Sequence, residues 1–375
     1  MTWKIPLFRM YWDEEDIRLV DEAIRSGMQW AAGPKIVEFE QGIAEYVRSK
    51  YCLTFNSGTS ALHAALAAYG IGKGDDVIVP SFTFIATANA PQFVGARPVF
   101  ADIEEKTCGI NPDDIIEKIT KKTRAIIPVH YGGCPCNITA LRDIAEDHNL
   151  ILIEDAAEAF GARIGDRKVG TFGDSGMFSF CQNKIITTGE GGAIVTDSQD
   201  LYEKMKLIRS HGRLETSDYF STSAVMDYIS LGYNFRISNI TAALGIAQLN
   251  KVEKIITIRR KDASRYIHNL NKSVPEIVIP EIPPRYFHVY QLFSVIAPDR
   301  DNLIKHLDTE GIMSKIYFSP VHQTAFYKNV LNYRCTLPVT EKVAGSIISL
   351  PFYPGIPSGD IDSVVGAIRE FYGEN

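Results

Sequence analysis

The chain contains 375 residues, of which 45% are hydrophobic and 22% are charged, as in ordinary globular proteins of two or three domains. Its net charge is −6, so no basic excess indicates a nucleic-acid partner. The start of the chain turns acidic without a continuous apolar run, and no apolar stretch is long enough to span a bilayer, so we expect neither a signal peptide nor a membrane partner. The 6 cysteines are scattered, which predicts a reduced, cytoplasmic protein.

Between about residues 50 and 200, short apolar runs alternate with stretches of helical spacing. In one of these stretches, SALHAALAAYG, the residues Leu62, Ala65 and Leu66 lie on one helix face. This alternation predicts an α/β domain with a largely parallel sheet, in which ligands bind at the carboxyl ends of the strands. The expected strands are Tyr51–Phe55, Val77–Pro80, Pro98–Ala101, Ala125–Val129 and Leu150–Glu154.

The pattern changes near residue 250. The stretch from Gly245 to Leu270 carries apolar residues at helical spacing and predicts one long helix that leaves the first domain. The proline-rich segment 275–284 then interrupts the pattern, and a smaller α/β region follows. We therefore expect a large domain over residues 1–250, which includes the N-terminal segment, and a small C-terminal domain over residues 251–375.

A run of small polar residues, Asn56-Ser57-Gly58-Thr59-Ser60, follows the first strand and opens a helix. The free amides at a helix start, the helix dipole and a flexible glycine all suit a phosphate group. The alternative is ordinary capping of the helix by a serine or threonine side chain. The motif alone leaves both interpretations open.

The tripeptide Cys134-Pro-Cys136 could form half of a metal site. No second Cys/His pair with zinc spacing accompanies it. The sequence therefore favours a loop with two free thiols and predicts no metal.

Two acidic residues follow the buried strand at Leu150–Glu154. Asp155 comes directly after this strand, where a carboxylate would face a ligand, and Glu158 lies three residues further on. Both residues also suit the start of a helix, because Asp caps helices and the dipole favours Glu in the first turn. Their positions alone do not decide between ligand binding and capping.

A lone lysine, Lys184, lies between a predicted short strand, Phe178–Phe180, and a glycine-rich turn, Thr187–Gly192. Most lysines are solvated, but the neighbours of this one are mostly neutral. A lysine that forms a Schiff base is desolvated or lies near positive charge, so that the neutral amine is accessible near pH 7. Lys184 is therefore a candidate for covalent catalysis.

Together these features specify pyridoxal 5'-phosphate (PLP) better than any other cofactor. PLP needs a lysine for its imine, a phosphate cup, an anion at the pyridine nitrogen and a flat apolar group against its ring. Lys184, Asp155 and the run 57–59 with Ser179 would supply the first three, and the segment 80–90 the ring partner. An NAD-type site fits less well, because no G-x-G-x-x-G opens a helix after a first strand.

Nine motifs lie in order along nearly the whole chain: SGMQWAAGPKIVEFE, NSGTSALHAAL, PSFTFIATANA, EDAAEAFGA, GTFGDSGMFSF, NKIITTGEGGAIVTD, GYNFRISNITAALGIAQL, PVHQTAFY and LPVTE. With these motifs the chain resembles the sugar aminotransferases of the DegT/DnrJ/EryC1/StrS family, which are PLP enzymes of fold type I, the aspartate aminotransferase-like fold. The resemblance implies a large PLP domain, in which helices sandwich a mostly parallel sheet, and a smaller C-terminal α/β domain.

The resemblance implies roles for four residues around the cofactor ring. Lys184 matches the lysine that forms the imine and then shuttles the proton. Asp155 matches the partner of the pyridine nitrogen, and Phe84 matches the aromatic residue stacked on the ring. Glu158 stands beside the phenolic oxygen, where many members carry Gln or His. A carboxylate there would repel a phenolate unless it is protonated or turned away.

Further roles concern the phosphate and the substrate. Gly58, Thr59 and Ser179 match phosphate ligands. Asn234 matches an asparagine that reaches the phosphate from a neighbouring subunit, which implies a homodimer with shared active sites. His322 lies where the family contacts the sugar nucleotide.

The sequence thus predicts a transaminase of two half-reactions. L-Glutamate gives up its amino group and leaves as 2-oxoglutarate, and a nucleotide-linked keto-6-deoxyhexose then accepts the amine for glycan or polysaccharide biosynthesis. The motifs EDAAEA and NKIITTGEGG are most similar to the perosamine-synthase branch, which favours a GDP-linked sugar and amination at C4. Two alternatives stay open, namely a PLP-binding regulator of the same fold and a PLP-dependent sugar dehydratase or lyase. Dehydratase members carry histidine in place of the lysine, which makes transamination the better hypothesis for a chain with Lys184.

Overall fold

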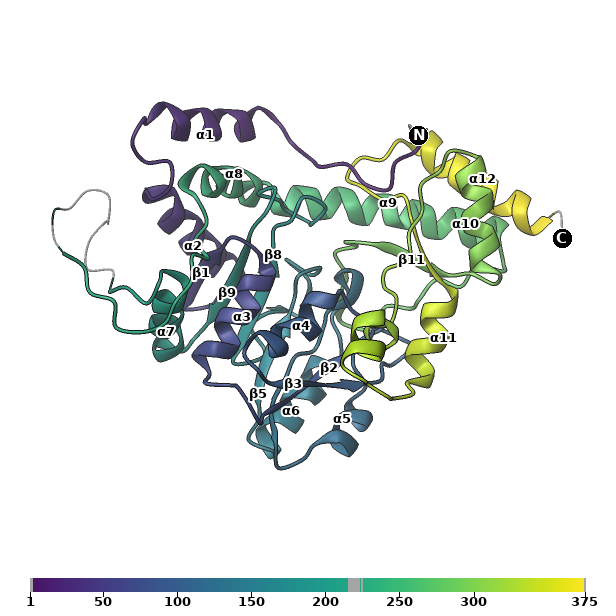
Figure 1. Cartoon of the computed structure of the whole chain (residues 1–375). Helices are drawn as coiled ribbons and strands as arrows, with labels where there is room; N and C mark the ends of the chain where they lie inside the picture. The colour runs from purple at the N-terminus through teal and green to yellow at the C-terminus, as the bar shows by residue number, and fades with distance from the viewer. Residues whose placement is uncertain (1–2, 215–222, 224, 374–375) are drawn as a thin grey trace.

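A computed structural model of the chain describes residues 3–214, 223 and 225–373. Its larger part is built on a seven-stranded sheet, and α9 runs from this part to a second one that carries α10, α11 and α12 (Figure 1). The helices are α1 (Glu14–Arg25), α2 (Pro34–Val47), α3 (Gly58–Ala68), α4 (Ile85–Phe93), α5 (Pro112–Lys118), α6 (Ile138–Asp147), α7 (Gln199–Arg209), α8 (Asn239–Asn250), α9 (Val252–Ser273), α10 (Arg300–Thr309), α11 (Pro338–Ser346) and α12 (Ser358–Gly373).

The central sheet has the strand order β1-β9-β8-β5-β4-β2-β3. Neighbouring strands are parallel except around β9, which is antiparallel to both β1 and β8. The predicted α/β architecture with a mostly parallel sheet is therefore confirmed. The strands are β1 (Tyr51–Phe55), β2 (Asp76–Pro80), β3 (Arg97–Ala101), β4 (Thr123–Ile126), β5 (Ile151–Asp155), β8 (Ser175–Ser179) and β9 (Gly192–Thr196).

Both faces of this sheet are buried, because alternate side chains of each strand enter different cores. Cys52 and Leu152 belong to one core, which α2, α6 and α8 cover. Their neighbours Leu53 and Ile153 belong to the other, which α3, α4 and α7 cover. The sheet is thus the middle layer of three, and its strand ends are the places left for ligands.

The five expected strands correspond to β1 to β5, and only β4 differs by more than a residue at either end. It starts at Thr123 and ends at Ile126, whereas the expected strand continued to Val129. Pro128 has no N–H to donate to a ladder, and Val129 forms only an isolated bridge with Asp155.

The single long helix expected from Gly245 to Leu270 is wrong, because the structure divides it into α8 and α9. Lys251 separates them with a non-helical backbone (φ −113°, ψ 9°). Its side chain is buried and pairs with Asp13 and with Asp16 of α1. The break thus lets the Lys251 ammonium form ion pairs at the start of α1. Helical periodicity alone does not predict such a contact.

A separate core lies in the C-terminal part and contains residues of α9, α10, α12 and the two-stranded sheet β11 (Phe293–Ile296) and β12 (Ile347–Leu350). Ile5 from the start of the chain also belongs to it, and Leu7 lies beside it through the bond that its carbonyl accepts from the Phe352 amide. We propose the division at residue 250 as the domain boundary. The segment that contains Ile5 and Leu7, here called the N-terminal strap, belongs by its contacts to the C-terminal part.

The remaining short strands β6 (Arg163–Ile164), β7 (Arg167–Lys168) and β10 (Tyr286–Phe287) form a three-stranded sheet between the two parts. Within the described ranges, no helix is both long and apolar enough to cross a membrane.

Candidate active site

Four strand ends meet at one edge of the central sheet. Because β1, β8 and β5 run in one direction and β9 in the other, the ends of the first three lie beside the start of β9. This order gathers Gly58, which follows β1, with Asp155 and Ser179, the last residues of β5 and β8. Lys184 lies in the loop that joins β8 to β9. Sequence positions more than a hundred residues apart thus converge, as expected for ligand sites of open α/β sheets.

The start of α3 forms a cup without room for side chains. Ser57 caps the helix, and its hydroxyl accepts a hydrogen bond from the Ser60 amide at 3.1 Å. A Cβ on Gly58 would lie 2.9 Å from Met177 Sδ and 3.3 Å from Ser179 Cβ, and one on Gly192 would lie 2.5 Å from Gly58 N. The capping interpretation is therefore correct for Ser57. The crowding of glycine backbone around a helix N-terminus is also the geometry that a phosphate needs.

Asp155 is buried at the end of β5 and is fixed by two donors. The Thr87 hydroxyl donates to its Oδ2 at 2.7 Å, and the Ala157 amide donates to its Oδ1 at 3.1 Å. Burial raises the pKa of Asp155, while these two donors and the Lys184 charge oppose the rise. The sequence analysis missed Thr87, although it lies one helical turn after Phe84 in the motif PSFTFIATANA.

Lys184 and Glu158 face each other across the site. The distance from Lys184 Nζ to Glu158 Oε1 is 3.5 Å, and both side chains are largely buried. Glu158 Oε2 accepts a hydrogen bond from the Gly132 amide at 2.9 Å. The carboxylate is thus held by a backbone donor and faces the amine. Gly132, which has φ +61°, was another residue that the sequence analysis missed.

The other predicted residues lie around this centre with different surroundings. Phe84 ends the turn after β2, is 60% exposed, and has its ring centroid 6.0 Å from that of Phe318. Thr59 is partly buried in the first turn of α3. Asn234 is exposed, and its carbonyl accepts a bond from Asn56 Nδ2 at 3.4 Å. The predicted roles of these side chains toward a ligand or a neighbouring subunit stay predictions.

His322 is buried, and both of its ring nitrogens have protein partners. Nδ1 shares a hydrogen bond of 2.7 Å with the Ser81 hydroxyl, and Nε2 lies 3.3 Å from Glu341 Oε1. Burial lowers the pKa of His322, which Glu341 opposes. These contacts connect the turn after β2 with the C-terminal part. Its predicted contact with a sugar nucleotide stays a prediction.

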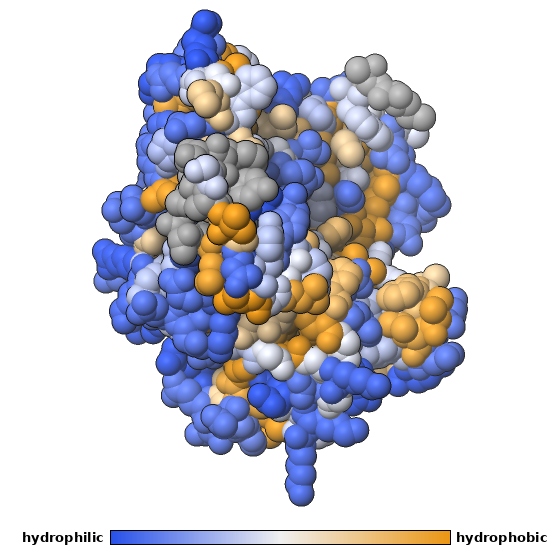
Figure 2. All heavy atoms as spheres, turned by 60° about the vertical axis from the view of Figure 1, so that its left-hand side comes forward, coloured by the Kyte–Doolittle hydropathy of each residue, from blue (hydrophilic) through white to orange (hydrophobic). Residues whose placement is uncertain are grey.

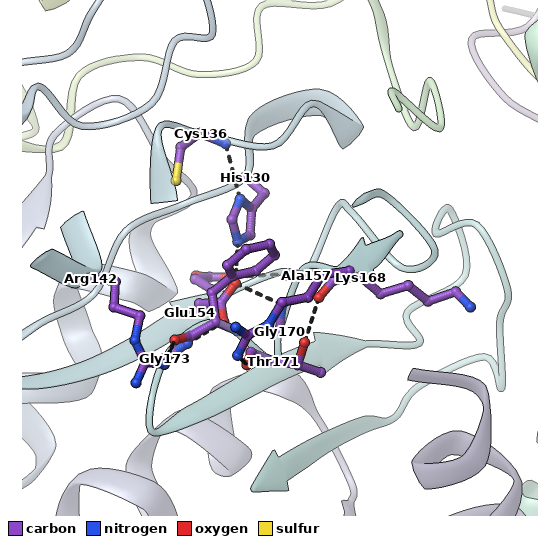
Figure 3. Close-up of polar contacts among 12 residues, drawn as sticks. His130, Cys136, Arg142, Glu154, Ala157, Lys168, Gly170, Thr171 and Gly173 are labelled. Atoms are coloured by element: carbon purple, nitrogen blue, oxygen red, sulfur yellow. Dashed lines mark hydrogen bonds and ion pairs between the residues drawn. The ribbon is translucent and has the colours of Figure 1, made fainter. Parts of the chain in front are cut away.

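A buried ionic network lies behind Asp155, on the neighbouring residue Glu154. Glu154 Oε1 accepts from the amides of Phe172 and Gly173, and Oε2 accepts from the Gly170 amide and from His130 Nε2 (Figure 3). His130 Nδ1 accepts from the Cys136 amide at 3.1 Å, so the ring proton is on Nε2.

This network also fixes the site itself. The His130 amide donates to the Asp155 carbonyl at 3.1 Å, and the turn that follows His130 carries Gly132. Side chains on the opposite face of β5 thus hold the backbone of Asp155 and the donor to Glu158.

The residues present fit PLP. The glycine-lined helix start accommodates a phosphate, and the buried, fixed carboxylate of Asp155 can face a protonated pyridine nitrogen. The Phe84 ring is exposed and free to cover a planar group, and Lys184 is the amine beside them. The chemistry of this donor set therefore agrees with the cofactor that the sequence predicts.

The two thiols of the Cys134-Pro-Cys136 loop are free and buried, and burial raises the pKa of Cys134 to about 12. In the part of the chain that the structure describes, no group of three or more metal-ligating side chains is arranged around a common point.

Comparison with known proteins identifies relatives over the full length. The chain is 36% identical to the GDP-perosamine synthase of Vibrio cholerae, with 98% of this chain and 99% of the relative covered. It is 38% identical to the GDP-perosamine synthase of Caulobacter vibrioides, with 91% of each covered. A pleiotropic regulatory protein of Geobacillus stearothermophilus is 36% identical, with 96% and 94% covered.

Solved structures also include relatives that match this chain over nearly its full length. Helicobacter pylori PseC, an aminotransferase of pseudoaminic acid biosynthesis, superimposes with a TM-score of 0.93 at 28% identity, with 99% of this chain and 100% of PseC covered. Spr1654 of Streptococcus pneumoniae, solved in a PLP form, has a TM-score of 0.90 at 26% identity and 99% coverage of both chains. The model of the DegT/DnrJ/EryC1/StrS aminotransferase family matches residues 11–369. The chain therefore belongs to the DegT/DnrJ/EryC1/StrS aminotransferase family and is an aminotransferase.

Proposed function

We propose that the protein uses PLP to move an amino group from L-glutamate to C4 of a GDP-linked 4-keto-6-deoxyhexose. The observation that carries this proposal is the position of Lys184, whose amine lies 3.5 Å from Glu158 beside the buried Asp155 and the glycine-lined start of α3. Two GDP-perosamine synthases among the relatives support the choice of substrate.

When bound, PLP supplies a protonated ring that withdraws electrons from the carbon next to the transferred nitrogen. The chain supplies the positions and the proton. The Asp155 carboxylate, fixed by Thr87, would hold the ring proton in place, and the Phe84 ring would cover one face. The Lys184 amine removes the proton from glutamate and later returns one to the amino sugar. The Glu158 carboxylate faces this amine at 3.5 Å and fixes its position.

The first test is the absorbance spectrum of the purified protein before and after L-glutamate is added. We expect a yellow protein that loses its colour with glutamate and releases 2-oxoglutarate. GDP-, dTDP- and UDP-linked 4-keto-6-deoxyhexoses should then be compared as acceptors, with the position of the amine determined by NMR. Lys184→Ala should fold, retain no covalently attached PLP after borohydride reduction, and transfer no amine.

The alternatives predict other results. A yellow protein that ignores glutamate would point to a dehydratase or lyase. A protein that takes up no PLP would exclude the enzyme and favour a regulator that has kept the fold without the cofactor. PLP fixed by borohydride to Lys184→Ala, or amine transfer by this variant at the wild-type rate, would contradict the role of Lys184.

We further propose that the protein is a homodimer. Figure 2 shows patches of apolar residues on the face that includes the α2 and α7 side of Figure 1. Near the N-terminus, Met28 is 91% exposed and Trp12 is 63% exposed, and Leu231, which directly precedes the motif that carries Asn234, is 80% exposed. Exposed apolar patches mark association surfaces.

Sedimentation velocity tests the dimer. Met28→Asp with Leu231→Asp should shift the wild-type dimer toward monomer, whereas Val278→Asp, which changes an exposed valine of the C-terminal part, should not. A monomeric wild-type protein would refute the proposal.

The free state of the cysteines among the described residues supports a reducing, cytoplasmic location.

A further inference from the structure

The residue before Lys184 is held by two side chains from the C-terminal part of the chain. The Gln291 amide Nε2 donates to the Asn183 carbonyl, and the Tyr317 hydroxyl is hydrogen-bonded to the Asn183 side chain. All three residues line one small cavity. The loop that carries the lysine is therefore fixed from outside the central sheet.

The same C-terminal segment also holds the carboxylate that faces the lysine. The Leu292 amide donates to the Gly132 carbonyl at 3.1 Å, and the Gly132 amide donates to Glu158 Oε2. A Cβ on Gly133 would lie 2.8 Å from Gln291 N, so the turn and the segment are in close contact. These contacts form a closed ring that runs from Lys184 through Glu158, the 132–133 turn and Gln291 back to Asn183.

The burial of Gln291 in this ring is unfavourable for stability. It is 3% exposed, and its Oε1 is buried without a hydrogen-bond partner among the residues that the structure describes. A buried, unpaired acceptor destabilises a fold, whereas replacing such a group with an apolar one of similar shape can be neutral. A glutamine here is therefore not explained by stability, which leaves its donor contact with Asn183 as its contribution.

We propose that Gln291 is a positioning residue, which acts with Tyr317 to hold the 180–188 loop so that the Lys184 amine stays opposite Glu158. This inference rests on the proposed function, because it assigns the loop to the reactive lysine. It adds that the arrangement of the C-terminal part controls the reach of that lysine.

The test begins with the cofactor-free protein, so that it does not depend on PLP chemistry. Gln291→Met removes the donor and the unpaired acceptor while keeping the side-chain length. We expect its melting temperature to stay within about 2 °C of wild type. Amide hydrogen exchange in residues 180–188 should become about five-fold faster, which is the effect of one lost hydrogen bond on local opening. The exposed Gln199→Met, at the start of α7, is the matched control and should change neither quantity.

Tyr317→Phe removes the second contact with Asn183 and should accelerate exchange in the same segment. It also keeps the test available if Gln291→Met does not fold. In the PLP-loaded protein, Gln291→Met should lower kcat about ten-fold with an unchanged KM for the sugar nucleotide, because the lysine and not the substrate is misplaced.

Unchanged exchange in residues 180–188 would overturn the inference. A lowered melting temperature with faster exchange throughout the chain would also overturn it, because Gln291 would then be merely structural. Failure of the proposed function has a separate signature: no PLP would be taken up by the wild type, while the exchange result would stand.

Discussion

The buried network around Glu154 gives a quantitative prediction for Glu154→Gln. The carboxylate accepts four hydrogen bonds, two on each oxygen. An amide has one oxygen and one NH₂ group. In either orientation its NH₂ faces two donors, either Phe172 N and Gly173 N or Gly170 N and His130 Nε2. Two of the four bonds are therefore lost.

The size of the effect follows from the charge of the acceptor. A hydrogen bond to a charged group contributes about 1.5–3 kcal/mol, so two lost bonds should lower the free energy of unfolding by about 3–6 kcal/mol. For a cooperative unit of roughly 250 residues the entropy of unfolding is about 0.5 kcal/mol/K, so the melting temperature should fall by about 6–12 °C. Differential scanning calorimetry of the cofactor-free proteins at equal concentration measures this, since bound ligands would shift both values.

Glu146→Gln is the matched control for this change. Glu146 is an exposed residue of α6 that pairs only on the surface with Arg142 at 2.6 Å, so its loss should change the melting temperature by about 1 °C or less. A Glu154→Gln protein that melts within about 2 °C of wild type would refute the assignment of four charge-assisted bonds to Glu154.

Two buried titratable groups and one crowded glycine give the other predictions. The pKa of His288 is lowered to about 3, first by burial and then by the Arg260 charge, so the unfolded chain binds the proton first and stability falls as the pH drops below 6.5. The side chain in His288→Asn can still accept the hydrogen bond from the Tyr290 amide but does not titrate. As the pH falls from 7 to 5, the free energy of unfolding of this variant, measured in urea, should therefore rise by about 1–2 kcal/mol relative to wild type. Parallel pH profiles of the two proteins would contradict this. Burial raises the pKa of Asp155 above 3.8, so its contribution to the stability of the cofactor-free protein is present below that pH and is lost as the pH rises through the raised value. The melting temperature of Asp155→Asn should accordingly rise relative to that of wild type as the pH increases from 4 to 7. A difference in melting temperature that does not change with pH would argue against this. Gly192→Ala would place its Cβ 2.5 Å from a backbone nitrogen of the cup and should weaken PLP binding about ten-fold in absorbance titrations. Gly366→Ala, whose Cβ meets no atom within 4 Å, should bind as wild type does, and equal affinity of both variants would exclude a phosphate at the cup.

The sequence predicted the fold most reliably where each strand is a short apolar run bounded by turn residues. β1 and β2 are of this kind, and the structure places Asp155 and Ser179 at the carboxyl ends of the adjacent strands β5 and β8. Such local patterns record burial on both faces of the sheet, which is why they could be read without the structure.

Contacts between distant segments could not be predicted in the same way. Thr87, Gly132 and Gln291 are ordinary residues in the sequence, and each becomes part of the site only through one hydrogen bond to a residue at least 26 positions away. The break at Lys251 has the same origin, because its carboxylate partners, Asp13 and Asp16, lie at the start of α1. Periodicity indicates which face of a helix is buried, but it does not indicate which charged residue of another element will pair with that face.

The strap formed by the first residues has a mechanical consequence. Ile5 bridges Ile312 in the C-terminal part, whereas α1, a few residues later, packs against α8 of the larger part (Figure 1). The chain therefore crosses between the two parts twice, once through this strap and once through α9. The two parts also contact each other where Ser81 bonds to His322 and where β6 pairs with β10. Neither part can therefore move away from the other unless these contacts break, and even then the strap and α9 keep the two parts together.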